Sequence, residues 1–72
     1  MNSVIKKNYI LINNVYLNID NIVELIPFKQ YTLDMSALVD AVRIFTNNGR
    51  EHIFVGTIEE IFRMISDARM GW

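Results

Sequence analysis

The 72-residue sequence contains no cysteine, one histidine, one proline and three glycines. The absence of cysteine excludes disulfide bonds and thiolate metal ligands, and the single histidine excludes a metal site built on several imidazoles. No internal repeat or low-complexity segment interrupts the chain. A domain this short buries a modest fraction of its surface, so we expect oligomerisation to supplement its stability.

The chain also has no marked excess of positive or negative charge. Seven basic and eight acidic residues give a formal net charge of −1, and the basic residues are scattered along the chain. This distribution lacks the positive footprint of proteins that bind nucleic acids or anionic membranes. The longest apolar runs are far shorter than a membrane span, and the N-terminus lacks the apolar segment of a secretory signal. We therefore expect a cytoplasmic protein without cofactors, whose partner is a protein and not a nucleic acid or a membrane.

Residues 42–55 are typical of a β-hairpin. Two β-branched and aromatic runs flank Asn47-Asn48-Gly49, and Asn-Gly favours a type I′ turn because both central residues of that turn need positive φ. With Asn48 and Gly49 as the central pair, the predicted partners are Asn47 and Arg50, Phe45 and His52, Ile44 and Ile53, Arg43 and Phe54, and Val42 and Val55. Side chains alternate across a strand. One face then carries Val42, Ile44, Ile53 and Val55, and the other carries Arg43, Phe45, Arg50, His52 and Phe54.

A helix is predicted directly after this hairpin. Thr57 precedes an apolar-periodic run and Glu60 follows three residues later, which is the spacing of a capping box. Gly71 lies close enough behind the last turn to help end the helix. Four apolar residues of the helix recur at helical spacing and predict one stripe on the sheet. The predicted core between sheet and helix is Ile44, Ile53, Val55, Ile58, Ile61, Phe62 and Ile65.

The first half of the chain indicates three further strands. Residues 9–12 and 15–18 flank Asn13-Asn14, a less committed turn than Asn-Gly, and predict a hairpin with Ile10, Ile12, Val15 and Leu17 on one face. Asp20 is expected to cap a short turn. Residues 23–26 then form a strand that ends at Pro27, which cannot donate to a ladder.

The segment from Phe28 to Ala41 (residues 28–41) follows neither the helical nor the strand period. Three alternatives stay open for it: a loop, a strand extension, or one helical turn that begins at Asp34. The sequence as a whole predicts one domain over residues 1–72 with an α+β fold. It consists of a small antiparallel β-sheet of about four to five strands in hairpins and one C-terminal α-helix packed on it. Residues 28–41 form a variable connection, and residues 69–72 form a frayed tail.

Three segments, residues 17–25, 42–49 and 55–61, resemble the FlbD-type small flagellar regulators and similar small bacterial and phage proteins. The resemblance spans residues 10–65 and rests on hydrophobic alternation together with Asn, Gly and Glu. It implies a compact β-sheet protein with a C-terminal helix and a non-catalytic accessory role. The connection over residues 28–41 is longer than the family pattern, and the tail to Trp72 is extra. The resemblance supplies no catalytic residue.

No residue pattern indicates an enzyme. His52 has no second histidine and no carboxylate at a ligand spacing, and the serines lie in no nucleophile motif. Glu59 and Glu60 form the one carboxylate pair that acid–base chemistry could use. Both are accounted for by the helix N-terminus, where negative charge and a capping box are favourable.

We therefore predict a non-enzymatic accessory or regulatory protein that acts by protein–protein interaction and forms homo-oligomers. Arginine and aromatic residues are enriched at protein interfaces, and such a face needs a cover, from another chain or from residues 28–41. The alternative is a phage- or mobile-element-encoded inhibitor that blocks a host nucleic-acid enzyme or defence complex, as anti-CRISPR proteins do. A third class is a single-stranded nucleic-acid-binding module, because phenylalanines that alternate with arginines resemble a stacking platform. The interface candidates are Arg43, Phe45, His52, Phe54, Tyr31, Met35, Leu38 and Trp72.

Overall fold

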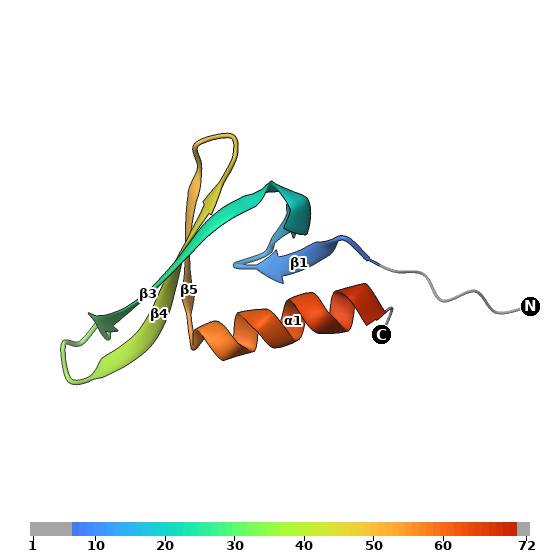
Figure 1. Cartoon of the computed structure of the whole chain (residues 1–72). Helices are drawn as coiled ribbons and strands as arrows, with labels where there is room; N and C mark the ends of the chain where they lie inside the picture. The colour runs from blue at the N-terminus through green and yellow to red at the C-terminus, as the bar shows by residue number, and fades with distance from the viewer. Residues whose placement is uncertain (1–6, 71–72) are drawn as a thin grey trace, which may run out of the picture.

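A computed structural model describes residues 7–70 and shows two small sheets and one helix. The elements are β1 (Tyr9–Ile12), β2 (Val15–Asn18), the 3-10 helix η1 (Ile19–Asn21), β3 (Ile22–Tyr31), β4 (Leu38–Thr46), β5 (Glu51–Val55) and α1 (Ile58–Met70). Strands β1 and β2 form one antiparallel sheet, and β3, β4 and β5 form the other in that order. Figure 1 shows α1 running beside β1, at one side of the three-stranded sheet. The predicted α+β fold of antiparallel hairpins and a C-terminal helix is confirmed.

The β1–β2 hairpin forms in the predicted register. Ile10 lies opposite Leu17, and Ile12 lies opposite Val15. The two turn residues, Asn13 and Asn14, have φ of 51° and 65°. Asparagine tolerates this left-handed conformation better than most residues, so the pair builds the two-residue turn that the predicted register needs.

The β4–β5 turn differs from the predicted two-residue turn. Gly49 has a φ of +82°, whereas Asn47 and Asn48 keep negative φ. The Thr46 amide donates to the Arg50 carbonyl at 3.0 Å, and the Gly49 amide donates to the Thr46 carbonyl at 3.0 Å. The connection is therefore a three-residue loop in which glycine takes the left-handed position.

This longer loop shifts the strand register by one residue, so the predicted pairing of β4 with β5 is wrong. Because side chains alternate with a period of two, a one-residue shift moves every β5 side chain to the opposite face. The observed pairs are Ala41 with Val55, Val42 with Phe54, Arg43 with Ile53, Ile44 with His52, and Phe45 with Glu51. The predicted common face of Arg43, Phe45, His52 and Phe54 is consequently split between the two sides of the sheet.

Strand β3 continues through Pro27, so the predicted end of this strand at the proline is wrong. β3 is an edge strand, and Pro27 lies opposite Val42. An edge strand tolerates proline where the missing N–H would point away from the neighbouring strand. Of the three alternatives for residues 28–41, the strand extension is confirmed, because β3 and β4 pair as far as Tyr31 and Leu38.

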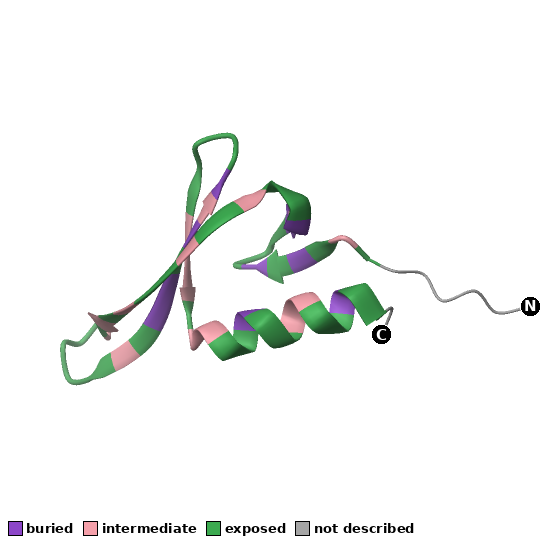
Figure 2. Ribbon diagram, in the orientation of Figure 1, coloured by how far each residue is buried: buried purple, intermediate pink, exposed green. Residues whose placement is uncertain are grey.

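The core lies between α1, the β1–β2 hairpin and the sheet face that we call the inner face. Its largest fully buried side chains are Ile12, Val42, Ile44 and Ile61. Figure 2 shows buried positions on β1, β4 and α1. The remaining buried members of this cluster are Ile10, Leu17, Ile19 and Ala68, and the inner-face residues Leu25 and Phe54 pack against it.

The predicted core is correct in part. Ile44 and Ile61 are buried, and Ile58 and Ile65 pack against the buried cluster. Phe62 and Val55 were predicted in this core but are 54% and 57% exposed, so those two predictions are wrong. Ile53 pairs with Arg43 and therefore also lies on the sheet face opposite the core.

The start of α1 has the predicted capping box. The Glu60 amide donates to Thr57 Oγ1 at 3.2 Å, and the Thr57 amide donates to Glu60 Oε1 at 3.2 Å. Gly56 precedes the cap with a φ of +153°, and a Cβ atom there would lie 2.5 Å from the Phe54 ring. The predicted helix stop at Gly71 lies outside the described residues.

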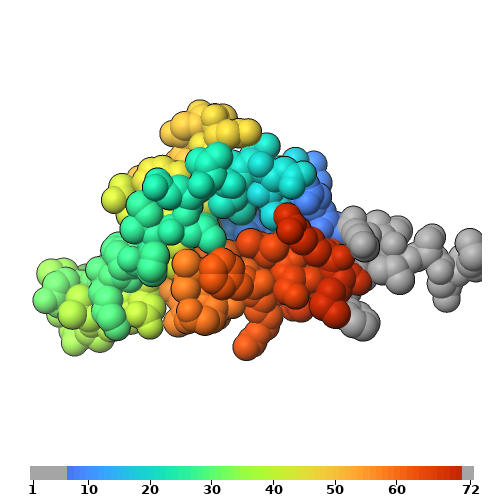
Figure 3. All heavy atoms as spheres, in the orientation of Figure 1, coloured from blue at the N-terminus to red at the C-terminus, as the bar shows by residue number. Residues whose placement is uncertain are grey.

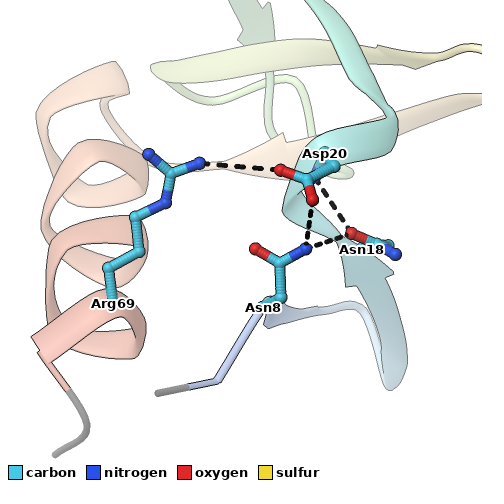
Figure 4. A network of polar contacts seen from close by, with 4 residues as sticks. All are labelled: Asn8, Asn18, Asp20 and Arg69. Carbon is cyan, nitrogen blue, oxygen red and sulfur yellow. Dashed lines mark hydrogen bonds and ion pairs between the residues drawn. The ribbon is translucent and has the colours of Figure 1, made fainter.

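Polar contacts attach the last turn of α1 to the other end of the chain (Figure 4). Asn8 Nδ2 donates to Asn18 Oδ1 at 2.7 Å and to Asp20 Oδ2 at 2.8 Å, and Arg69 Nη2 lies 3.9 Å from Asp20 Oδ1. The Lys7 amide also donates to the Ala68 carbonyl at 2.9 Å. The cap of η1 is Asn18, whose side chain accepts from the Asp20 amide, and not Asp20 as predicted.

Candidate protein interface

Strands β3 and β4 extend beyond the rest of the sheet as a two-stranded arm, which we define as residues 29–40. Strand β5 ends at Val55, opposite Ala41, and the Gly56 amide makes a last contact with the Asp40 carbonyl at 2.8 Å. Figures 1 and 3 show the arm projecting past the start of α1. An isolated two-stranded ribbon is marginally stable in water, so the apolar side chains that the arm carries require an explanation.

The tip of the arm is apolar and exposed. Leu33 is fully exposed, and Tyr31, Met35 and Leu38 each keep more than half of their surface in solvent. Three of the predicted interface residues, Tyr31, Met35 and Leu38, are therefore brought together here. Leu33 was missed, although apolar residues at every second position from Tyr31 to Met35 were an available signal.

The turn at the tip is held by the Asp34 carboxylate. Asp34 Oδ1 accepts hydrogen bonds from the Ser36 hydroxyl at 2.7 Å, the Thr32 hydroxyl at 2.6 Å and the Ser36 amide at 3.0 Å. These bonds, that of the Ser36 hydroxyl first, lower the pKa of Asp34 from 3.8 to about 2. Met35 has a φ of +61°, a conformation that residues other than glycine and asparagine rarely adopt.

The sheet face opposite the core, which we call the outer face, carries apolar side chains from all three strands. Helix α1 and the β1–β2 hairpin both pack on the inner face. On the outer face, the start of α1 lies beside Phe28 and Ala41, with which it lines a cavity of about 290 Å³, and the rest of this face is left open. Ala41 is buried between its neighbours, whereas Val55 and Ile26 are exposed. The apolar residues of this face are Ile26, Phe28, Val39, Ala41, Phe45, Ile53 and Val55.

Charged side chains gather at the end of the outer face that lies near the β4–β5 turn. Arg43 forms an ion pair with Glu51, and its Cζ atom lies 5.2 Å from the centroid of the Phe45 ring. Glu24 lies opposite Phe45 on the neighbouring strand. A guanidinium over an aromatic face is a favourable contact, and both residue types are common in protein interfaces.

A shallow hollow connects the outer face to the arm. It has a volume of about 600 Å³ and is lined by Val39 and Val55 from the outer face and by Leu33, Asp34 and Ser36 from the turn. The outer face and the arm tip therefore form one continuous surface. We call it the contact surface; its apolar residues are those of the outer face together with Tyr31 and Leu33, which line the hollow. Leu38 has the strand parity of Val42 and Ile44 and lies on the other side of the arm.

The other predicted interface residues lie elsewhere. Phe54 packs against the core. His52 lines a cavity of about 310 Å³ together with Tyr9, Tyr16 and Arg50, on the opposite side of the sheet from Phe45. Trp72 lies outside the described residues. The row of alternating phenylalanines and arginines that resembled a stacking platform is therefore not formed.

Both edges of the three-stranded sheet are obstructed. The Thr32 amide donates to the Ala37 carbonyl. Because alternate residues of β3 hydrogen-bond to β4, the backbone groups of the residues in between point away from β4; these are Leu25, Pro27, Lys29 and Tyr31. Pro27 has no N–H, so the row of donors on the free edge of β3 is interrupted. On the free edge of β5, the Ile53 carbonyl accepts a hydrogen bond from Asn13 Nδ2 at 2.6 Å. Such obstruction protects edge strands from pairing with other chains.

Within residues 7–70, no group of three or more histidine, aspartate or glutamate side chains is placed to hold a metal ion. No helix in this range is long and apolar enough to cross a membrane.

No protein-family model matches the chain, and no curated protein sequence or solved structure matches it significantly. The resemblance to FlbD-type regulators therefore stays a prediction.

Proposed function

We propose that the chain is a non-enzymatic accessory protein that acts by binding a protein chain through the contact surface. The observation that carries this proposal is the arm tip, where Leu33 is fully exposed on a turn that hydrogen bonds to Asp34 hold in place. An exposed leucine adds nothing to folding stability. The left-handed conformation of Met35 itself costs on the order of 1 kcal/mol. Burial of Leu33 within the described chain therefore does not offset the conformational free energy that the turn costs.

The extent of the contact surface supports the same proposal. It runs without interruption from Phe45 through Val55 to Leu33. The largest contiguous apolar patch on a soluble monomer is about 300–600 Å² and is often functional. Burial of apolar surface stabilises a complex by about 25 cal/mol per Å², so covering this surface is a sufficient driving force for association.

Site-specific photocrosslinking tests the proposal. A photoreactive phenylalanine analogue at Leu33 should give discrete protein adducts in cells that express the chain, because this position faces the partner. The matched control is the same analogue at Glu59, an exposed position on α1. Changing Tyr31 to serine should weaken the adducts from position 33, since the hollow beside Leu33 then loses an apolar wall.

Absence of adducts from position 33, or equal adducts from positions 33 and 59, would contradict the proposal. Circular dichroism of each variant shows whether it is folded. Leu33 and Tyr31 are both exposed, so we expect unchanged spectra.

A further inference from the structure

We propose that the partner on the outer face is a second copy of this chain, packed face to face and antiparallel, with Phe45 of one copy over the arm hollow of the other. This inference rests on the proposed function and names its partner. Three features of the structure lead to it: the obstructed sheet edges, the distribution of charge on the outer face, and the area that the face offers.

The obstructed edges disfavour the simplest way for two sheets to associate, which is pairing of their edge strands. Continuous pairing along β3 meets Pro27, and pairing along β5 meets the Asn13 side chain bound to the Ile53 carbonyl. The outer face has no such obstruction. Two copies of the sheet therefore associate through their faces, about 10 Å apart as in other sheet packings.

Charge selects one of the two symmetric face-to-face arrangements. With a twofold axis along the strands, β4 lies over the partner's β4, so Arg43 meets Arg43 and Glu24 meets Glu51. Both contacts join like charges. With the axis across the strands, the charged end of one copy lies over the uncharged residues Gln30 and Val39 of the other, and like charges stay apart.

The antiparallel arrangement also matches the shape of the surface. If the axis follows the central row of Phe28, Ala41 and Val55, Phe45 lies four residues, or roughly 13 Å, from the axis. Four residues from Ala41 in the other direction is Ala37, at the base of the turn beside the hollow. Each Phe45 ring is thereby placed over the partner's hollow, and each Arg43 is placed over the partner's Val39. Ala41, the smallest side chain of the face, lies at the centre and allows close approach.

The available area requires the arm. Three strands of five to seven residues present roughly 240 to 330 Å² of flat surface, from a rise of about 3.3 Å per residue and a spacing of about 4.8 Å. A stable interface buries about 800 Å² per partner. The outer face alone falls short of this value, whereas the antiparallel arrangement adds both arms to the contact.

Sedimentation equilibrium measures the oligomeric state. The parent chain should form a dimer, and Val55→Asp should be a folded monomer whose association is weakened by about a hundredfold or more, because a carboxylate would be buried at the axis without a partner. Val55 is 57% exposed in the single chain, so the substitution should leave the fold intact. The matched control, Val15→Asp, changes an exposed valine of the β1–β2 hairpin and should remain dimeric. A monomeric parent, or a dimeric Val55→Asp variant, overturns the inference.

The absence of cysteine allows a second, geometric test with single engineered thiols. A short bismaleimide should link two copies of Val55→Cys, which face each other across the axis, and should leave Arg43→Cys unlinked. Linkage through Arg43→Cys and not through Val55→Cys would overturn the antiparallel arrangement.

The photocrosslinking experiment separates this inference from the proposed function. Adducts from Leu33 to a different protein, together with a monomeric parent, would overturn the inference and support the proposed function. Loss of all adducts from Leu33 would contradict the proposed function itself.

Discussion

Ile61 and Phe62 are neighbours on α1 that the sequence pattern does not distinguish, and the structure separates them. Ile61 is fully buried in the core, whereas Phe62 is 54% exposed. Successive residues of a helix point about 100° apart, so only one of the two can point directly at the sheet. Replacing each by alanine therefore tests which face of α1 packs on the sheet.

The two substitutions should differ clearly in their effect on the free energy of unfolding. Ile61→Ala removes a fully buried side chain and should cost about 2–5 kcal/mol. A domain of this length has a total stability of roughly 4–11 kcal/mol, so the variant loses a large part of it. Phe62→Ala should cost less than about 1.5 kcal/mol, because half of the ring is already in water, and alanine, the best helix former, offsets part of that loss.

Urea unfolding followed by circular dichroism at 222 nm (the helical band) measures both changes. All variants should be compared at one protein concentration, since association with a second copy would add to the apparent stability. If Phe62→Ala cost more than Ile61→Ala, the orientation of α1 described above would be wrong.

Three further predictions concern backbone conformation and charge. Gly56→Ala should lower the free energy of unfolding by more than about 1 kcal/mol in urea, because its Cβ atom would meet the Phe54 ring at 2.5 Å; a neutral result would contradict the close approach. Asn14→Gly should be neutral or stabilising in thermal melts, whereas Asn14→Val should destabilise, since φ is +65° there; equal effects of the two would argue against the two-residue turn. The pKa of Asp34 is lowered to about 2, so the stability that its carboxylate contributes is complete above pH 3.8 and is lost as the pH falls through 2. NMR titration of the Asp34 carboxyl carbon checks this value, and an ordinary pKa would mean that the hydrogen bonds from Thr32 and Ser36 are not formed in solution.

Local features of the fold were predictable because they depend on residues close in sequence. The Thr57 and Glu60 capping box involves atoms three residues apart, and the β1–β2 register follows from a turn of only two residues. The position of the strand over residues 9–12 and the start of α1 could therefore be predicted without knowledge of the rest of the chain.

The register of β4 and β5 could not be predicted without the tertiary structure. A two-residue and a three-residue loop both suit Asn47-Asn48-Gly49, and they differ by one residue in the pairing. The observed loop places Phe54 opposite Val42, where it packs against the buried core. Packing between distant segments, not the turn sequence, distinguishes the two registers.

The candidate interface divides in the same way. Tyr31, Met35 and Leu38 could be named from the sequence, because they are apolar residues in a segment that follows no regular period. That they lie with Leu33 at the end of an arm depends on β3 continuing past Pro27, which is possible only at the edge of a sheet. The sequence by itself determined the local turns and caps, where a few neighbouring atoms decide the conformation. Only the tertiary structure decided which faces are covered and which strand lies at the edge, because both depend on contacts between residues far apart in the chain.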